Sequence, residues 1–162
     1  MSVPLASIEK SFDLPLLQQF CERLAQLLSA GDVVLLNGPL GSGKTQLVTC
    51  LAQSLGSADQ VSSPTYGLAN FYQTSHMPIL HIDTYRLEDQ AEFRQLGLDE
   101  YFDSHLVLVE WGAKVQSDFD EPLEVSLDFA GDDSNDGMRT LIFSFEGTDW
   151  QTRVEQALKE IE

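Results

Sequence analysis

Residues 38–45, Gly-Pro-Leu-Gly-Ser-Gly-Lys-Thr, decide the fold of this 162-residue chain. They fit the pattern G-x-x-x-x-G-K-[ST], a loop that cradles the phosphates of nucleoside triphosphates. Its glycines let backbone N–H groups turn inward around an anion, and the helix that follows begins with unpaired N–H groups. Lys44 can reach the β- and γ-phosphates, and the Thr45 hydroxyl can coordinate Mg²⁺. We therefore expect a nucleotide site that is formed by Gly38, Pro39, Leu40, Gly41, Ser42, Gly43, Lys44 and Thr45.

The segments on either side of this loop have the patterns of a strand and a helix. Residues 33–36, Val-Val-Leu-Leu, form a short apolar run that is typical of a buried strand. From Leu47 to Leu55, apolar residues recur at helical spacing, and Gly56 ends the run. This phosphate-binding motif requires a strand, a loop and a helix in that order. An ordinary glycine-rich turn is therefore a poor alternative explanation.

The rest of the chain alternates between predicted helices and strands. Period-two alternation in the last two predicted strands, with the Asp- and Gly-rich residues 131–137 between them, is typical of an antiparallel hairpin. Interleaved strands and helices predict an α/β fold. Because no linker or repeat interrupts the pattern, residues 1–162 are expected to form one domain. We predict helices at 15–28, 87–96 and 150–161, and strands at 67–72, 78–82, 106–109, 123–129 and 140–145.

Acidic charge is concentrated in the second half of the chain. Residues 1–80 carry three basic and five acidic side chains, whereas residues 81–162 carry six and 21, for a net charge of −17. Phosphate backbones are bound by Lys and Arg, so this chain is not expected to hold DNA or RNA alone. It can act on RNA through a basic partner, or the charge can serve solubility.

The cysteine count and the apolar runs point to a cytoplasmic protein. Two cysteines, Cys21 and Cys50, are too few for a disulfide framework or a four-cysteine zinc site. No apolar run approaches the ~20 residues that cross a bilayer. The first residues lack the basic and apolar regions of a signal peptide. We therefore expect no contact with a membrane.

Residues 81–86, His-Ile-Asp-Thr-Tyr-Arg, end one of the predicted strands. Ligands gather beyond the carboxyl ends of strands in open α/β sheets. Asp83 can hold Mg²⁺ or polarise an attacking water there, and Arg86 can neutralise phosphate charge. The alternative is a capping aspartate and a surface arginine. His81 by itself is interpreted as a packed or hydrogen-bonded histidine.

Glu110 follows the apolar run 106–109, which is the Walker B form of a strand that ends in a carboxylate. Such a carboxylate binds Mg²⁺ or orients water. Trp111 comes next and packs either on a ligand or partner or in the core. In Ser-Pro-Thr-Tyr, residues 63–66, the hydroxyl of Thr65 can act as a GTPase-like switch, unless the segment is an ordinary proline turn. No N-K-x-D or T-K-x-D guanine motif occurs, which favours ATP.

The order of the motifs GPLGSGKT, SPTY, HIDTYR and VEW resembles that of the TsaE (YjeE) family, from about Asp13 to Arg139. These are the P-loop ATPases that threonylcarbamoyladenosine modification of tRNA requires. The resemblance implies a P-loop NTPase-like three-layer sandwich with a mostly parallel central sheet, which binds ATP and Mg²⁺ and hydrolyses ATP weakly. It also implies the partners TsaB and TsaD. In that assembly TsaD modifies the tRNA and ATP hydrolysis resets the complex, so this chain meets tRNA only indirectly.

The resemblance also implies roles for individual residues of this sequence. Lys44, Asp83 and Glu110 correspond to catalytic residues, and Thr45, Asp83 and Glu110 to metal ligands. Thr65, Arg86 and Trp111 join residues 38–45 in binding the nucleotide. The sequence departs from many members at Gln46, where a second threonine is common, and at Lys114, near which an acidic residue is common.

Two other functions remain open from the residues. In a small-molecule kinase, Asp83 would act as the base for a substrate hydroxyl. Kinases of that kind usually carry an arginine-rich lid, whereas the five arginines here, at 23, 86, 94, 139 and 153, do not cluster in the sequence. In a non-catalytic nucleotide-dependent binding module, Asp83 and Glu110 would be metal ligands only.

Overall fold

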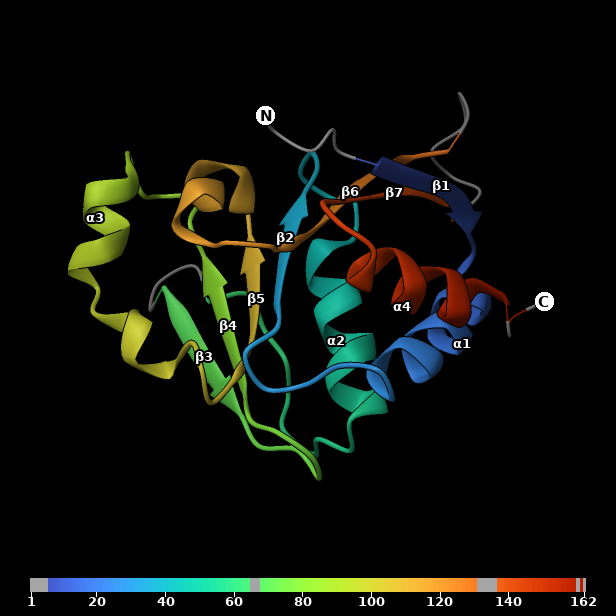
Figure 1. The fold of residues 1–162 in the computed structure, drawn as a ribbon, viewed down its shortest axis with the longest axis horizontal. Coiled ribbons are helices and arrows are strands. Elements are labelled where there is room, and N and C mark those ends of the chain that lie inside the picture. Colours follow the sequence, from blue (N-terminus) through green and yellow to red (C-terminus); the bar gives the residue numbers. More distant parts are fainter. Residues whose placement is uncertain (1–5, 65–67, 131–136, 160, 162) are drawn as a thin grey trace.

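The computed structural model describes residues 6–64, 68–130, 137–159 and 161, which build one seven-stranded sheet flanked by helices (Figure 1). Its strand order is β1-β7-β6-β2-β5-β4-β3. The strands are β1 (Ala6–Phe12), β2 (Val33–Asn37), β3 (Ala69–Tyr72), β4 (Ile79–Asp83), β5 (Leu106–Glu110), β6 (Leu123–Phe129) and β7 (Arg139–Phe145). The helices are α1 (Leu14–Ala25), α2 (Lys44–Ser54), α3 (Gln90–Gln95) and α4 (Asp149–Lys159), with 3-10 helices η1 (Leu98–Tyr101) and η2 (Gly112–Asp118).

The centre of the sheet is parallel and its two edges are antiparallel. Strands β6, β2, β5 and β4 run parallel to one another, whereas β3 pairs with β4, β7 with β6 and β1 with β7 in antiparallel fashion. Every residue of β4 and β5 is buried, as expected for parallel strands that are covered on both faces. The predicted parallel centre and the late antiparallel strand pair are confirmed. Of the predicted hairpin loop, residues 131–136 lie outside the described part of the chain.

Two hydrophobic clusters divide the molecule into three layers, which confirms the predicted sandwich. Val34 and Leu36 of β2 point into the cluster beneath α1, α2 and α4. Leu35, between them, points to the opposite face, where Phe93 of α3 and Val115 of η2 pack. Figure 1 shows α1, α2 and α4 together on one side of the sheet and α3 on the other. In the part of the chain that the structure describes, no helix is long and apolar enough to cross a membrane.

Strand β1 is not predicted by the sequence pattern. It lies at the sheet edge, and Phe12 is its one buried side chain, so its sequence lacks the apolar run of a central strand. Phe12 packs against Phe20 and Phe143, with ring centroids 5.4 and 6.4 Å away. The predicted start of α1 is confirmed, because Asp13 caps it by accepting a hydrogen bond of 2.8 Å from the N–H of Leu16.

Several predicted helix boundaries are wrong by a few residues. Helix α1 ends at Ala25 rather than at residue 28, and α3 begins after its capping residue Asp89 rather than at residue 87. The 3-10 helices η1 and η2 were not predicted, because four to seven residues give too short a pattern to recognise. The errors in α1 and α3 lie away from the carboxyl ends of β2, β4 and β5, whereas η2 begins directly after the site residue Trp111.

Candidate nucleotide site

The loop between β2 and α2 is shaped as an anion cradle. Gly38 has φ +151° and lies so close to β6 that a Cβ atom there would be 2.3 Å from the carbonyl oxygen of Leu127. Gly43, with φ +107°, is the N-cap residue of α2. The Ser42 hydroxyl is buried and has no hydrogen-bond partner among the described residues. A buried unpaired hydroxyl inside a glycine cradle fits a bound phosphate group.

The Lys44 ammonium folds back onto this loop. Its Nζ donates to the carbonyl oxygens of Gly38 at 2.6 Å and Pro39 at 3.1 Å. It also lies 4.0 Å from the ring centroid of Trp111, a cation–π contact. Burial lowers the pKa of Lys44, and the nearby charges of Glu110 and Asp83 oppose that shift. The lysine is thus held at the cradle, where a phosphate oxygen can replace the two carbonyls.

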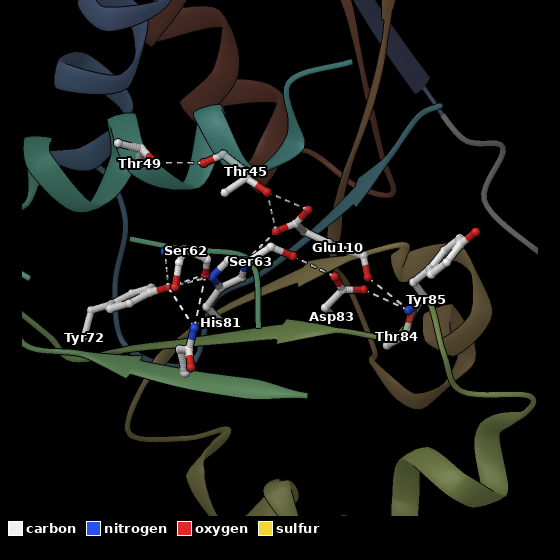
Figure 2. Close-up of polar contacts among 11 residues, drawn as sticks. Thr45, Thr49, Ser62, Ser63, Tyr72, His81, Asp83, Thr84, Tyr85 and Glu110 are labelled. Carbon is white, nitrogen blue, oxygen red and sulfur yellow. Dashed lines mark hydrogen bonds and ion pairs between the residues drawn. The ribbon is translucent and has the colours of Figure 1, made fainter. Parts of the chain in front are cut away.

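Thr45, at the start of α2, contacts Glu110, at the end of β5, on the face of the sheet that α2 covers. The Thr45 hydroxyl donates to the Glu110 carboxylate and is 3.0 Å from both of its oxygens (Figure 2). Parallel pairing places Leu36 of β2 beside Glu110 of β5, which brings the end of β5 next to the loop. The described residues contain no group of three or more His, Cys, Asp and Glu side chains able to hold a metal ion. Magnesium at nucleotide sites takes one or two protein oxygens together with phosphates and water, so Thr45 and Glu110 fit it.

Asp83 lies beside Glu110, because β4 and β5 pair these two residues directly. Its Oδ2 accepts a hydrogen bond of 3.0 Å from the Ser63 hydroxyl, and its Oδ1 accepts one of 2.8 Å from the N–H of Tyr85. Asp83 is therefore both a turn-capping residue and a site residue. Asp83 and Glu110 are only 5% and 3% exposed, so any ligand that they bind must enter the cleft.

The cleft between the loop and the two carboxylates has a volume of about 450 Å³. Trp111 lines it and belongs to neither hydrophobic cluster, so the alternative that Trp111 is a core residue is wrong. Its φ of +60° is uncommon for a bulky residue and marks a turn that the surroundings hold in place. The lining residues are Leu40, Gly41, Gly43, Lys44, Thr45, Gln46, Ser63, Asp83, Tyr85, Glu110 and Trp111.

Among the described residues, four predicted site residues do not line this cleft, and three of them, Gly38, Pro39 and Ser42, belong to the loop beside it. Arg86 is exposed and does not line it. Thr65 lies outside the described residues.

The sequence analysis did not assign Gln46, Ser63, Tyr85 or Lys114 to the site, although Gln46 and Ser63 line the cleft. Tyr85 lines the cleft, and its ring centroid is 5.0 Å from that of Trp111. Lys114 donates to the carbonyl oxygens of Thr84, Tyr85 and Leu87 at 2.9–3.0 Å. The interpretation of His81 as a packed or hydrogen-bonded histidine is confirmed, because it is fully buried and its Nε2 lies 2.6 Å from Glu110 Oε2, although Glu110 was not predicted as its partner. One feature of the sequence indicated that His81 lies on the side of the strand that faces the site: residues 81 and 83 are two apart in a strand and so share a face.

Comparison with known proteins identifies the family. Residues 13–140 match the model of the family "Threonylcarbamoyl adenosine biosynthesis protein TsaE". This chain belongs to the TsaE family. The range agrees with the one that carries the four motifs, so the resemblance seen in the sequence is confirmed.

Individual relatives support the assignment. The tRNA threonylcarbamoyladenosine biosynthesis protein TsaE of Streptomyces coelicolor is 36% identical over 140 residues, which cover 84% of this chain and 95% of that protein. The TsaE protein of Bacillus subtilis is 40% identical over 114 residues, covering 69% of this chain and 71% of the relative. The crystal structure of Bacillus subtilis YdiB matches with a TM-score of 0.75 and 26% identity, over 98% of this chain and 97% of YdiB. This TsaE protein therefore has the same fold as YdiB.

Proposed function

We propose that this chain is the ATP-binding and ATP-hydrolysing component of the machinery that forms threonylcarbamoyladenosine in tRNA, and that its hydrolysis of ATP resets a TsaB–TsaD transferase complex. The observation that carries the proposal is the convergence of Lys44, Thr45 and Glu110 at one cleft, in a member of the TsaE family. The partners and the reset step are taken from the resemblance. The single α/β sheet, built from residues 6–145, supports one ATPase domain.

A second cavity supports the binding of a whole nucleotide rather than of a phosphate ion alone. It has a volume of about 270 Å³ and shares Gly41, Ser42, Gly43 and Gln46 with the loop. Phe12, Leu14 and Arg139 contribute apolar and stacking surface to its wall. We assign this cavity to the base and the first cleft to the triphosphate. The absence of a guanine motif from the sequence makes adenine the expected base.

The residues at the cleft divide the work of hydrolysis among them. Thr45 and Glu110 would hold Mg²⁺, which supplies neutralising charge to the phosphate oxygens when bound. Lys44 exchanges its two carbonyl acceptors for phosphate oxygens. Asp83 has a carboxylate at the cleft and can orient the attacking water. Contacts of Arg86 and Thr65 with the nucleotide are proposed on the resemblance alone.

The net charge of −17 supports a division of labour between this chain and its partners. A chain with so few cations gains little from counterion release, so we propose that TsaB and TsaD hold the tRNA. The same assembly is proposed to work in the cytoplasm.

The arginine positions make a small-molecule kinase a weaker explanation. Among the described residues, none of the five arginines lines the 450 Å³ cleft. Arg94 and Arg153 pair with Asp118 and Asp32 instead.

The test is ATP turnover without an added acceptor, measured with and without TsaB and TsaD homologues and with Lys44→Ala as the control. We expect slow release of phosphate that the partners accelerate and that Lys44→Ala abolishes. In a parallel assay with added metabolites, transfer of the γ-phosphate to one of them would favour a kinase, and no turnover in any mixture would favour a binding module.

A further inference from the structure

A chain of buried hydrogen bonds leads from Glu110 through β4 to the edge strand β3 (Figure 2). His81 Nε2 lies 2.6 Å from Glu110 Oε2, and His81 Nδ1 lies 2.9 Å from the Tyr72 hydroxyl. The Tyr72 hydroxyl is in turn 3.1 Å from the carbonyl oxygen of Ser62. His81 is fully buried and Tyr72 is 3% exposed. Neither lines the cleft, and the contact between His81 and Glu110 is the direct link from these two residues to a side chain that does.

Counting donors and acceptors gives the hydrogen positions. An ionised carboxylate only accepts, so His81 Nε2 must carry the proton that faces Glu110. In the neutral imidazole Nδ1 is then an acceptor, and the Tyr72 hydroxyl donates to it. Because the Tyr72 hydroxyl then has no proton left for the Ser62 carbonyl oxygen, that oxygen accepts its hydrogen bond from Asn70 Nδ2, 3.1 Å away. The tyrosine hydroxyl thus selects the histidine tautomer that serves Glu110.

We propose that Tyr72 and His81 are positioning residues that hold the Glu110 carboxylate toward Thr45. A carboxylate that is 3% exposed depends on its hydrogen bonds for both its charge and its orientation. Thr45 supplies one donor from the cleft side, and His81 supplies one from the opposite side. Partners of this kind fix the orientation of metal-binding side chains. The proposal rests on the proposed ATPase function of the same cleft.

The far end of the relay lies beside the second carboxylate. The relay Glu110–His81–Tyr72 reaches Ser62 through the Ser62 N–H, which donates to the Tyr72 hydroxyl at 3.4 Å, and the next residue, Ser63, donates to Asp83 Oδ2 at 3.0 Å. Two consecutive residues therefore contact both carboxylates of the cleft, one through the relay and one directly. A displacement of residues 62–63 changes the hydrogen bonding of Asp83 and Glu110 together. The relay is thus a route by which residues 62 and 63 affect the geometry of the cleft.

The first test is Tyr72→Phe, which removes the hydroxyl and keeps the ring. We expect kcat to fall about 10- to 100-fold, as for other partners of metal-binding side chains, while nucleotide affinity stays unchanged. Tyr101→Phe, a tyrosine of η1 that packs on Phe71 and His105, is the matched control and should keep wild-type turnover. His81→Gln, which retains a donor for Glu110, should keep more activity than His81→Leu. Thermal melting shows whether each variant is folded.

Two further measurements separate positioning from general support of the fold. If Tyr72 acts through Glu110, the loss of rate on Tyr72→Phe disappears in the Glu110→Gln background. Independently of activity, ¹⁵N NMR of the nucleotide-free protein should show His81 as the Nε2–H tautomer, a preference that Tyr72→Phe weakens. Wild-type turnover of Tyr72→Phe, an equal loss in both backgrounds, or an Nδ1–H tautomer would each overturn the relay. If the wild-type chain hydrolyses no ATP even with its partners, the proposed function fails instead, and the tautomer still decides the relay.

Discussion

The two sides of the cleft are built by different means. On the α2 side, the eight consecutive residues 38–45 contribute backbone N–H groups and one lysine, and their glycines allow the loop to curve around an anion. On the opposite side, Asp83 and Glu110 come from different strands and are adjacent because β4 and β5 pair in a particular register. The first side depends on local backbone conformation, and the second on long-range pairing and on side-chain partners. We expect the first side to control nucleotide binding and the second to control the rate of hydrolysis.

The largest effect is expected on ATP binding, from a substitution in the phosphate-binding loop. Lys44→Ala should abolish tight ATP binding, because it removes the cation that the structure places at the cradle. Calorimetry with ATP measures the loss. An unchanged affinity would contradict the role of the loop and the comparison between the two sides.

Glu110→Gln tests the side of the cleft that Asp83 and Glu110 form. It should keep nucleotide binding and lower partner-stimulated hydrolysis by about 10²–10³-fold, because size and shape stay while the charge at Thr45 is lost. Parallel measurements of affinity and phosphate release separate the two effects. A rate within a few-fold of the wild type would place Glu110 outside the reacting centre.

Asp83→Asn should act on repeated turnover of the whole assembly. The amide keeps the shape of the turn at Tyr85 but lacks the charge that orients water, so the assembly should form and fail to reset. We expect modification of tRNA by the reconstituted components to fall to about a single round. Quantifying modified adenosine per complex over time tests this, and undiminished multiple rounds would contradict it.

The smallest effect is expected from Ser63→Ala. It removes one of the two hydrogen bonds that position Asp83, worth about 1 kcal/mol, so hydrolysis should slow several-fold. Ser7→Ala, at an exposed position on β1, is the matched control. If Ser63→Ala lowers nucleotide affinity and leaves the rate of hydrolysis unchanged, the carboxylate side also controls binding, which contradicts the expected separation of the two sides.

The two sides also differ in how far the sequence predicts them. The loop, its strand and its helix were predicted because every signal for them lies within about two dozen consecutive residues. The apolar runs that end at Asp83 and Glu110 identified both carboxylates as candidates, but their adjacency follows from strand order, which one sequence does not specify. The same reason explains why the contact of His81 with Glu110 was missed, since its partner is 29 residues away.

Strand β1 was missed, and Trp111 was left with two interpretations, because their signals are weak or ambiguous. Strand β1 has a largely exposed edge sequence, so its pairing with β7 has no counterpart in local hydrophobicity. Trp111 is a large aromatic residue after a buried strand, a pattern equally typical of a core residue and of a residue that lines a cleft. Its left-handed backbone conformation is what turns the ring toward Lys44, and composition does not reveal such a conformation.

The way Lys44 folds back has a consequence for how long a nucleotide stays bound. With two carbonyl acceptors available inside the loop, the ammonium is satisfied before any phosphate arrives. Binding then gains only the difference between phosphate and carbonyl partners, and a departing product leaves behind a cation that is already solvated by the protein. The two loop carbonyls therefore compete with phosphate oxygens for the same ammonium, and we expect this competition to shorten the residence time of a bound product.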